Sequence, residues 1–423
     1  IKCCEVIMRL SNNLMYQSNI NKILDNQQGV ANAQERVTTG EKYLSTSESP
    51  SAYSQAALYT TKIQTNEQYT KNINQLNNRL NTEETVLSSI TDAIQKAQTL
   101  TIQAGNGALN TNDKVSISKE LEELQQTLLS LMNTRSEDGK YIFSGYQDST
   151  QPYQFETSSG KYNYNGDQGQ HSITIAEGVS VKSSDNGFDT FEKVDARLDV
   201  ASNTGDTTST LTGTVYVDEQ GMFDQYHKSN YNSDPAAAAT ANTFNVQVTA
   251  GVNPGDANQY QILRDGSALS PPVKGEDSEG GIEFAVMKIQ IDSPALDQFN
   301  FSLEEPKKVN VLNTLQELIS ELNNGSLDGA DFQDVLNDGL VQLKNASEQV
   351  LFTQASLGGR MSALSRITDS NLAQDIQNKD NRANLIEVDM AEAISELTKQ
   401  ETALQASQAT FGRLSKLSLF DYL

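Results

Sequence analysis

The chain contains 423 residues, of which 36% are hydrophobic, and it carries a formal net charge of −24. This length allows two or three domains, and the apolar content is too high for a disordered chain but small for one large core. The negative charge argues against nucleic acid and anionic membranes as partners, because both repel an acidic protein.

The N-terminal segment shows no targeting signal. No run of 18 apolar residues predicts a membrane helix, and residues 1–10 lack the apolar core of a secretory signal peptide. Both cysteines, Cys3 and Cys4, precede Met8, and we expect residues 1–7 to be an extension before a native start at Met8. A working protein without cysteine has neither a disulfide framework nor thiol chemistry.

Residues 11–45 carry an apolar side chain at every seventh position. This spacing predicts a helix with one apolar stripe, which ends or bends at Gly40. The stripe consists of Tyr16, Ile23, Val30, Val37 and Leu44. A break rich in serine and threonine follows at 45–50, and a second helix is expected to start near Pro50, since proline is tolerated in a first helical turn.

The strongest periodicity lies in residues 51–104, where two sets of apolar residues alternate at heptad spacing and only Glu83 interrupts them. It predicts a long helix that ends at Gly105–Gly107. A third helix, capped within Thr111–Asp113 and striped with leucine to residue 131, is expected to fold back antiparallel.

At Ser136 the pattern changes. Residues 138–146 predict a turn and a short aromatic strand, and short alternating runs continue to about residue 305. These runs are 161–164, 172–175, 213–217, 244–248, 260–263, 284–287 and 299–303. The pairs Asn165-Gly166 and Asp265-Gly266 predict hairpin turns. We interpret residues 151–306 as a β-rich insertion, either a compact sandwich or two small lobes, with a loop or helical turn at 236–241.

Helical patterns return at Lys307. A short amphipathic helix should close at 323–325, and a second one over 330–367 should continue through Gly358-Gly359. The last segment, 384–423, has a stripe made of Met390, Ile394, Leu397, Leu404 and Phe411. The predicted fold is mainly α: a long antiparallel helical, coiled-coil rod made from both chain ends, with a central β-rich inserted domain.

The stripes of the two chain ends are expected to face each other. Each is narrow and flanked by Gln, Ser, Thr and Glu, so neither helix can be stable alone. The alternative is an ordinary helical bundle whose first and last helices happen to be neighbours.

Nothing in the chain predicts catalysis. His171 and His227 have no metal-ligand neighbour at helical spacing, and no phosphate loop or Gly-x-Ser-x-Gly motif occurs. The Asp- and Asn-rich segments 185–187 and 199–206 could hold calcium, but they lack EF-hand spacing and plain turns account for them better. We therefore predict no enzyme, no cofactor and no metal.

Four segments together resemble the flagellin superfamily. They are the opening Met8-Arg9-Leu10-Ser11, the Gly-Lys-Tyr-Ile-Phe-Ser-Gly of 139–145, the Ile-Glu-Val-Asp-Met-Ala-Glu-Ala of 386–393, and the ending Leu-Ser-Leu-Phe-Asp-Tyr-Leu of 417–423. The resemblance covers residues 8–150 and 307–423. The chain departs from the family at Glu48-Ser49, where an acidic pair often precedes the proline.

The resemblance implies three domains. Residues 8–45 with 396–423 would form an inner coiled-coil domain, and 46–150 with 307–395 a helical rod. Residues 151–306 would form an outer domain, whose role the resemblance leaves open.

The resemblance also implies a structural role. The chain would be a helically assembled subunit at the junction between the hook and the filament of a bacterial flagellum, outside the cell, after export through the flagellar type III apparatus. Its partners would be copies of itself, neighbouring flagellar subunits and, transiently in the cytoplasm, an export chaperone. The chaperone would bind Leu397, Leu404, Phe411 and Leu414.

Two alternatives remain. The first is a flagellin of the filament itself, which the Phe-Ser-Gly segment and the Leu-Phe-Asp-Tyr-Leu ending argue against. The second is a secreted enzyme or binding domain on a coiled-coil stem, with its site in residues 151–306.

Overall fold

The computed structural model describes residues 2–202, 211, 213–238, 240–251, 258–276, 281–291, 297–324 and 329–420. It describes their side chains from residue 14 to residue 413, apart from those of residues 202, 271, 276, 324, 330 and 331. These residues form two compact units: one comprises 1–78, 172–181 and 359–423, and the other 79–171 and 182–358.

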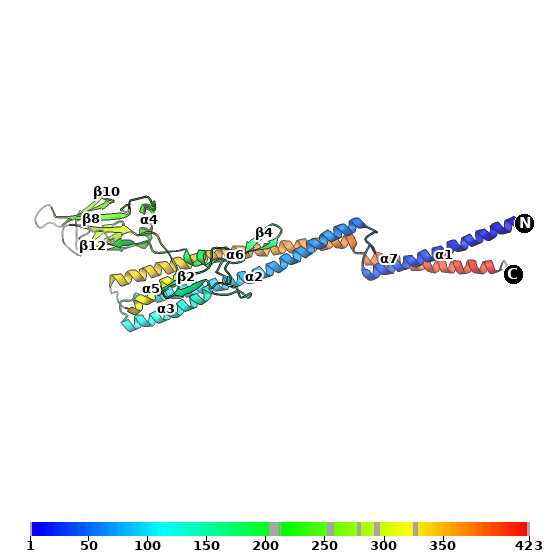
Figure 1. Ribbon diagram of the computed structural model, residues 1–423, viewed down its shortest axis with the longest axis horizontal. Helices are drawn as coiled ribbons and strands as arrows, with labels where there is room; N and C mark the ends of the chain where they lie inside the picture. Colours follow the sequence, from blue (N-terminus) through cyan, green and yellow to red (C-terminus); the bar gives the residue numbers. More distant parts are fainter. Residues whose placement is uncertain are drawn as a thin grey trace. The chain divides into compact units, whose positions relative to one another are not determined.

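Long helices at both chain ends confirm the mainly α fold with a central strand-rich region (Figure 1). The α-helices are α1 (Lys2–Thr39), α2 (Pro50–Ala104), α3 (Thr111–Met132), α4 (Gln220–Asn230), α5 (Val311–Asn324), α6 (Ala330–Ile386) and α7 (Met390–Phe420). A short π-helix, η1, spans Phe188–Glu192. The sequence patterns did not predict α4 or η1.

The helix ends follow from local chemistry. Gly40 ends α1 with a φ of 72°, a conformation that favours glycine. Pro50 opens α2, where its lack of an amide hydrogen removes one donor that the first helical turn could not pair. The cap of α3 is Asn110, one residue earlier than predicted, and its side chain exchanges hydrogen bonds with Asp113 in a capping box.

Three local predictions were wrong. Residues 138–146 contain no strand; an isolated bridge joins Arg135 to Tyr141. The pair Asn165-Gly166 follows a strand instead of closing a hairpin, whereas Asp265-Gly266 does close one, with φ values of 48° and 70°. The run 284–287 is a tight turn, because Ala285 and Val286 adopt φ values of 48° and 69°.

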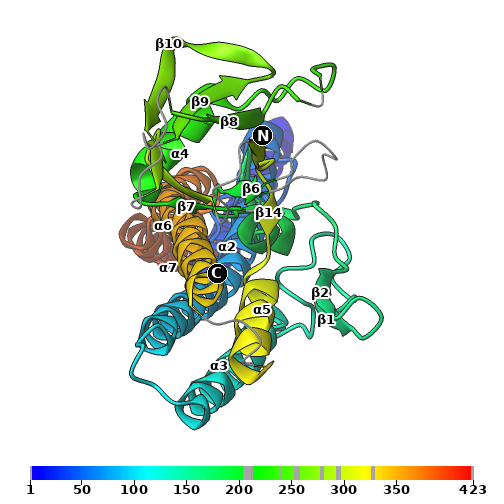
Figure 2. The same ribbon diagram turned by 90° about the vertical axis from the view of Figure 1, so that its left-hand side faces the viewer.

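The two larger sheets are antiparallel throughout. One has five strands in the order β10-β9-β8-β13-β6, of which β8, β9 and β10 are labelled in Figure 2, and the other has three in the order β11-β12-β7. Their strands are β6 (Val200–Ser202), β7 (Gly213–Val217), β8 (Thr243–Thr249), β9 (Gln259–Arg264), β10 (Ser267–Glu276), β11 (Ile282–Phe284), β12 (Met287–Ile291) and β13 (Gln298–Leu303).

Three two-stranded sheets complete the set: β1-β2, β3-β4 and β14-β5. Their strands are β1 (Tyr153–Glu156), β2 (Lys161–Tyr164), β3 (Ser172–Ala176), β4 (Val179–Lys182), β5 (Val194–Asp195) and β14 (Lys308–Val309).

The segment 151–306 is divided more finely than the sequence pattern suggested. One apolar core fills only Val200–Leu303, where Phe244, Phe299 and Phe301 are fully buried. The hairpin β1-β2 belongs with the helices of its unit, since the Tyr162 amide donates to Asn313 of α5 at 2.7 Å. In the other unit, Asn72 of α2 donates to the carbonyl oxygen of Thr174 in β3 at 2.7 Å.

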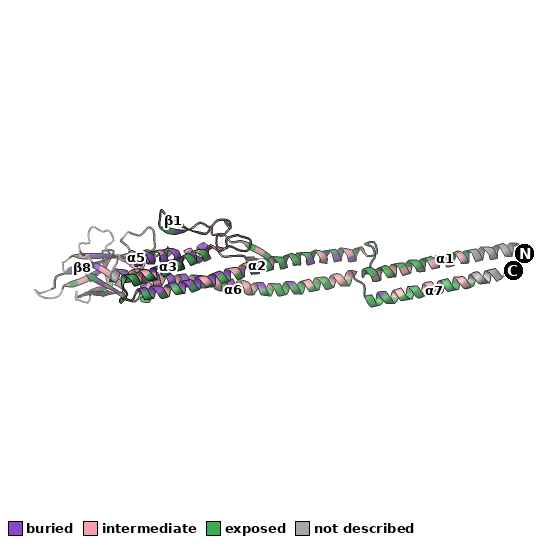
Figure 3. Ribbon diagram, turned by 90° about the horizontal axis from the view of Figure 1, so that it is seen from below, coloured by how far each residue is buried: buried purple, intermediate pink, exposed green. Residues whose placement is uncertain are grey.

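The helices of the second unit bury a continuous apolar core, seen as buried positions on α2, α3, α5 and α6 in Figure 3. It is built from fully buried leucine, isoleucine and valine, including Leu87, Ile94, Leu128, Leu315, Leu343 and Val350. The interrupting Glu83 is also buried and accepts a hydrogen bond from the Asp185 amide at 2.9 Å. Helix α6 continues through Gly358 and Gly359, as predicted.

Candidate assembly surface of the terminal helices

Helices α1 and α7 pack against each other as an antiparallel pair (Figure 1). The rings of Tyr16 and Phe411 meet edge to face, with centroids 5.2 Å apart. Ten residues further along α1, Asn26 donates to the Ser407 hydroxyl at 2.7 Å. The two stripes that the sequence showed thus lie in one seam, although the chain separates them by almost its full length.

Most of the predicted stripe residues lie half-buried along this seam: Tyr16, Ile23, Val30, Val37, Leu397, Leu404 and Phe411. Three others do not. Met390 and Ile394 are 45% and 52% exposed. Met390 shares the helix face of Leu397 but is the first residue of α7. Leu44 lies beyond the end of α1 at Thr39. The Leu414 side chain is outside the described residues.

Sequence reasoning missed the polar half of the seam. Asn19 and Asn26 are half-buried and Ala33 is buried, each three residues after a member of the α1 stripe. On α7 the corresponding places hold Ala393, Gln400 and Ser407. Polar residues at seam positions fix register at a cost in stability. The signal was present in the sequence, since 19, 26 and 33 also recur every seven residues.

Close packing at Gly29 contributes to the same register. A Cβ atom at Gly29 would lie 2.8 Å from the side-chain oxygen of Gln400, so a side chain there would displace Gln400. Gln400 itself donates to Glu396 at 2.6 Å, and this hydrogen bond, with help from Lys399, lowers the pKa of the Glu396 carboxyl. Gln400 thus contributes to the seam by close packing on Gly29, whereas Asn26 donates hydrogen bonds across it.

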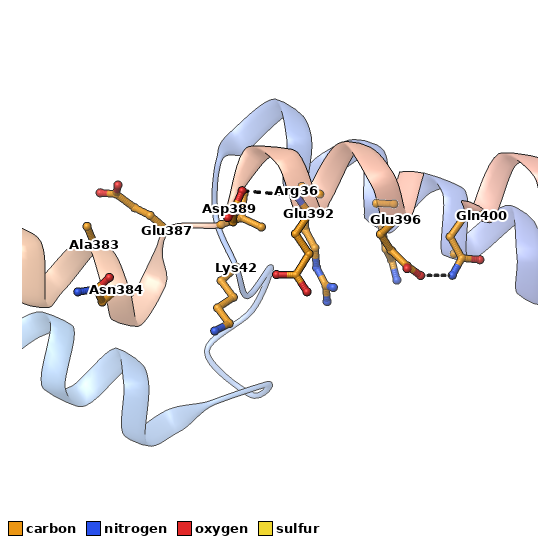
Figure 4. A pocket seen from close by; sticks show the side chains of 14 residues that line it. Arg36, Lys42, Ala383, Asn384, Glu387, Asp389, Glu392, Glu396 and Gln400 are labelled. Atoms are coloured by element: carbon orange, nitrogen blue, oxygen red, sulfur yellow. Dashed lines mark hydrogen bonds between the residues drawn. The ribbon is translucent and has the colours of Figure 1, made fainter. Parts of the chain in front are cut away.

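At the end of the seam the two connecting segments cross, and a polar hollow of about 760 Å³ opens between them (Figure 4). The Lys42 amide donates to the Ile386 carbonyl at 2.8 Å, and the Val388 amide donates to the Gly40 carbonyl at 2.9 Å. These two hydrogen bonds make a short antiparallel bridge, which ties the connection before α2 to the connection after α6.

An ion pair holds the bend itself. Glu48 lies 3.5 Å from Arg36 of α1 and also accepts the Leu44 amide at 3.4 Å. Both side chains are more than a third exposed, so the pair contributes well under about 1 kcal/mol and mainly orients the loop. Glu48 is the acidic residue that this chain retains where the family often has two.

Apolar side chains remain exposed on the outside of the helix pair. On α1 these are Leu14 at 69%, Met15 at 50%, Ile20 at 43% and Leu24 at 56% exposure. With Met390 and Ile394, they show that the terminal helices offer more apolar surface than their own seam covers. Exposed apolar surface of this kind marks a site of contact with other protein.

The histidines are accounted for by local packing. His171 lies 3.8 Å from Asp148 and packs edge to face on Tyr146. His227 is buried, its Nε2 lies 2.8 Å from the Glu304 carbonyl oxygen, and burial lowers its pKa. Asn186, in one of the acidic turns, accepts the Asp189 amide of η1 at 2.7 Å.

The other acidic segment contributes to a charge cluster around Arg197. The guanidinium lies 3.4 Å from Asp199, 2.6 Å from Asp334 and 2.9 Å from Asp338. Burial raises the pKa of Asp199 to about 6, although the nearby Arg197 opposes this. The carboxylates thus already have a cation, and residues 203–206 lie outside the described residues.

Among the described residues, none of the helices is long and apolar enough to cross a membrane.

Comparison with known proteins shows relatives over nearly the whole chain. Residues 10–148 match the family described as bacterial flagellin N-terminal helical region. Flagellar hook-associated protein 3 of Escherichia coli K12 is 28% identical over 415 residues, which cover 98% of this chain and 99% of the relative. The protein of the same name from Salmonella typhimurium LT2 is 26% identical over 414 residues, again covering 98% and 99%.

Solved structures agree on the fold. A flagellar hook associated protein-3 from Legionella pneumophila aligns with a TM-score of 0.59 at 22% identity, over 78% of this chain and 98% of that one. FlgL of Xanthomonas campestris aligns with a TM-score of 0.56 at 22% identity, over 76% and 98%. The chain is therefore similar to flagellar hook-associated protein 3 over nearly its whole length, and its residues 10–148 match the N-terminal helical region of bacterial flagellin.

Proposed function

We propose that this chain is a structural subunit of the bacterial flagellum that forms the junction between hook and filament. The observation that carries the proposal is the match to two proteins named flagellar hook-associated protein 3, which spans 98% of the chain and 99% of each relative. A shared helical region alone would fit any flagellin, whereas a match across the whole length includes the central β region as well.

Assembly would use the terminal helices. Their seam contains asparagine, glutamine and serine, so it buries little apolar area. This burial has to offset a backbone entropy cost of about 1–2 kcal/mol for each ordered residue. The exposed Leu14, Leu24 and Ile394 would be covered by copies of the chain and by neighbouring flagellar subunits. Contacts of this kind repeat by helical symmetry and are heterologous.

The domain division follows from the same proposal. Residues 8–45 and 396–423 would form the inner domain, 46–150 and 307–395 the rod, and the β region the outer domain. The apolar core at Val200–Leu303 supports an outer domain smaller than 151–306, because β1-β2 packs on the helices of its unit.

The export route would require a chaperone. A helix with a half-buried stripe and exposed apolar residues is prone to aggregate before it finds its partners. A cytoplasmic chaperone on Leu397, Leu404, Phe411 and Leu414 would cover that stripe until the chain passes through the type III apparatus. The absence of catalytic function would follow from the structural role.

The test is localisation in the cell that makes the protein. Immunogold labelling with an antibody against residues 200–303 should give a narrow band where the hook meets the filament, and deletion of the gene should leave hooks without filaments. Label along the whole filament would show that the chain is a flagellin instead. Full filaments in the deletion strain would refute a junction role.

A further inference from the structure

Four asparagines in this chain directly precede a glycine, at positions 106, 165, 186 and 324. In such a pair the glycine nitrogen can attack the side-chain carbonyl carbon of the asparagine and form a cyclic imide. Glycine favours the attack, since it has no side chain to restrict the backbone around that nitrogen. Gly325 lies outside the described residues, and the other three pairs belong to one unit of the structure. The fold treats these three pairs differently.

Asn106 and Gly107 lie in the exposed connection between α2 and α3 (Figure 2). The side-chain oxygen of Asn106 accepts the Ala108 amide at 3.1 Å. This hydrogen bond closes a ring of atoms that includes the Gly107 nitrogen, so it keeps the side-chain carbonyl of Asn106 folded over the peptide that has to attack it. The Ala108 amide also donates to the oxygen on which negative charge develops during the attack, and such a donor stabilises that charge.

The Gly107 nitrogen is accessible for this reaction. Within the described part of the chain, its amide donates no backbone hydrogen bond, and the residue is exposed. Beyond the two neighbouring residues, no heavy atom lies within 4 Å of the place that a Cβ atom would occupy at Gly107. The ring can therefore close without disturbing any packed side chain.

The pair Asn186-Gly187 is blocked by burial and hydrogen bonding. The Asn186 side chain is 1% exposed and its oxygen accepts the Asp189 amide. The Gly187 amide donates to the carbonyl oxygen of Phe143 at 2.7 Å. Attack by this nitrogen would first require that hydrogen bond to break.

The pair Asn165-Gly166 is exposed at Asn165 but its backbone is fixed on both sides. The Asn165 amide donates to Pro152 at 2.7 Å, and the amide after Gly166 donates to Ser144 at 3.1 Å. A Cβ atom at Gly166 would lie 2.4 Å from the Tyr164 hydroxyl and 2.9 Å from the Cα of Ser144. The rotation that ring closure needs would therefore break hydrogen bonds and close contacts.

We propose that Asn106 is a site of spontaneous deamidation to which the fold directs the reaction. The Gly107 nitrogen bonds to the side-chain carbonyl carbon of Asn106, the bond to Nδ2 breaks, and ammonia leaves with the proton of the Gly107 amide. Water then opens the imide at either of its carbonyls and gives aspartate or isoaspartate. Both products place a new carboxylate just beyond Ala104, the last residue of α2, where the helix dipole disfavours negative charge. The proposal does not depend on a role at the junction.

The test is incubation of the folded full chain in mildly alkaline buffer made with oxygen-18 water, followed by tryptic digestion in ordinary water and mass spectrometry. Oxygen-18 in the product shows that the reaction preceded digestion. The peptides 97–114, 162–182 and 183–193 report the three pairs separately. Asn106 should react at least about tenfold faster than Asn165 and Asn186, because the latter two must first lose hydrogen bonds or packing. In guanidinium chloride, which unfolds the chain, the three rates should become similar.

Gly107→Ala is the matched variant. The open space at Gly107 admits a methyl group, so circular dichroism should show an unchanged fold. The methyl group hinders ring closure, and deamidation of Asn106 should slow at least about tenfold, a small change in activation free energy.

Three outcomes would overturn the proposal. The first is an unmodified Asn106 in the folded chain under conditions that deamidate the synthetic peptide 97–114. The second is a rate at Asn165 or Asn186 of the folded chain equal to that at Asn106. The third is an unchanged rate in Gly107→Ala, or a product that fragmentation of the peptide places at Asn110 or Asn112 instead.

Discussion

Arg197 joins the β region to the helices of its own unit. Its side chain is 3% exposed and contacts Asp334 and Asp338 of α6, while its Nε donates to Gln220 of α4 at 2.7 Å. Removing the cation would leave three carboxylates close together with their charges uncompensated. Arg197 thus compensates the charges of the three carboxylates, which would otherwise repel one another and destabilise the fold.

We expect Arg197→Met to destabilise the chain by about 3–5 kcal/mol, because it breaks a buried ion pair on one side only. Lys193→Met is the control, since its ion pair with Asp189 is almost half exposed and should be worth less than about 1 kcal/mol. Urea unfolding followed by circular dichroism measures both. Equal effects of the two substitutions would show that the Arg197 cluster does not stabilise the contact between the β region and the helices.

The Asp199 carboxyl should make stability depend on pH. Its pKa in the folded chain is about 6, above the ordinary 3.8, so the fold favours the protonated form. This stabilisation is fully present at pH values below the pKa of Asp199 in the unfolded chain, and it is lost as the pH rises through about 6. Relative to Asp199→Asn, wild type should therefore lose melting temperature between about pH 4 and about pH 7. A constant difference across that range would refute the assignment.

Val286 lies in a turn whose geometry suits glycine. Its φ of 69° crowds the Cβ atom of a branched residue, and such a conformation costs about 1–2 kcal/mol. We expect Val286→Gly to raise stability by roughly 1 kcal/mol, with part of the relief offset by greater freedom in the unfolded chain. Gly266→Val, at a φ of 70° in the β9–β10 turn, should do the reverse. Thermal melting of both variants checks the pair.

At the scale of the element, the terminal helices differ from the others in what holds them. Helices α2, α3, α5 and α6 bury leucine and isoleucine completely, whereas the described seam of α1 and α7 has alanine as its fully buried apolar residue. The seam gains its register from the hydrogen bonds of Asn26 and the packing of Gln400 on Gly29 rather than from a large apolar area. We therefore expect α1 and α7 to be the least stable elements of the isolated chain.

Two double substitutions distinguish the role of the seam from that of the exposed side chains of α7. Leu404→Ala with Phe411→Ala removes seam contacts, including the ring contact with Tyr16. Truncating a fully buried Leu or Phe to Ala lowers the free energy of unfolding by about 2–5 kcal/mol, and half-buried positions lie at the lower end of this range. We expect faster cleavage of both chain ends in limited proteolysis, weaker chaperone binding and no filament growth beyond the hook.

Met390→Ala with Ile394→Ala is the matched pair at exposed positions of α7. Both side chains are about half exposed, so the isolated chain should resist protease as wild type does. Assembly should still suffer if these residues contact neighbouring subunits, which electron microscopy of the mutant cells measures. Protease sensitivity equal to that of the seam variant would show that the two faces are not distinct.

At the scale of the whole molecule, the β region should be removable at its core boundary. Leu303 pairs with Val200, and the Glu304 amide donates to the Asp199 carbonyl at 2.9 Å, so the two ends of the segment are adjacent. We expect deletion of residues 199–303 with a short Gly-Ser bridge to leave the helices folded, with a higher helical signal per residue in circular dichroism.

Deletion of 151–306 is the informative comparison. It also removes Tyr162, whose amide bonds Asn313 and whose hydroxyl donates to Gln125 of α3. The buried Gln125 and the half-buried Asn313 would lose these partners, so this larger deletion should unfold at lower temperature than the smaller one. If both deletions melt alike, β1-β2 contributes nothing to the helical core.

Sequence alone determined the long helices at both ends of the chain, their main ends and the stripes of the two termini. Heptad spacing, Pro50 and Gly40 act through local geometry, which a short window of residues contains. The same is true of Asp265-Gly266, whose turn needs positive φ at both positions. The resemblance to flagellins could also be read from four short segments outside residues 151–306.

Tertiary structure decided which of those residues meet. The stripe of α7 could not be separated into Leu404 on the seam and Ile394 on the outside, because apolar spacing does not say which partner covers a side chain. The turn at Ala285-Val286 goes against local residue preference and forms because β11 pairs with β12. Glu83 is buried because the Asp185 amide, distant in the chain, donates a hydrogen bond to it. The Arg197 cluster depends on contacts between segments far apart in the chain, which no local pattern encodes.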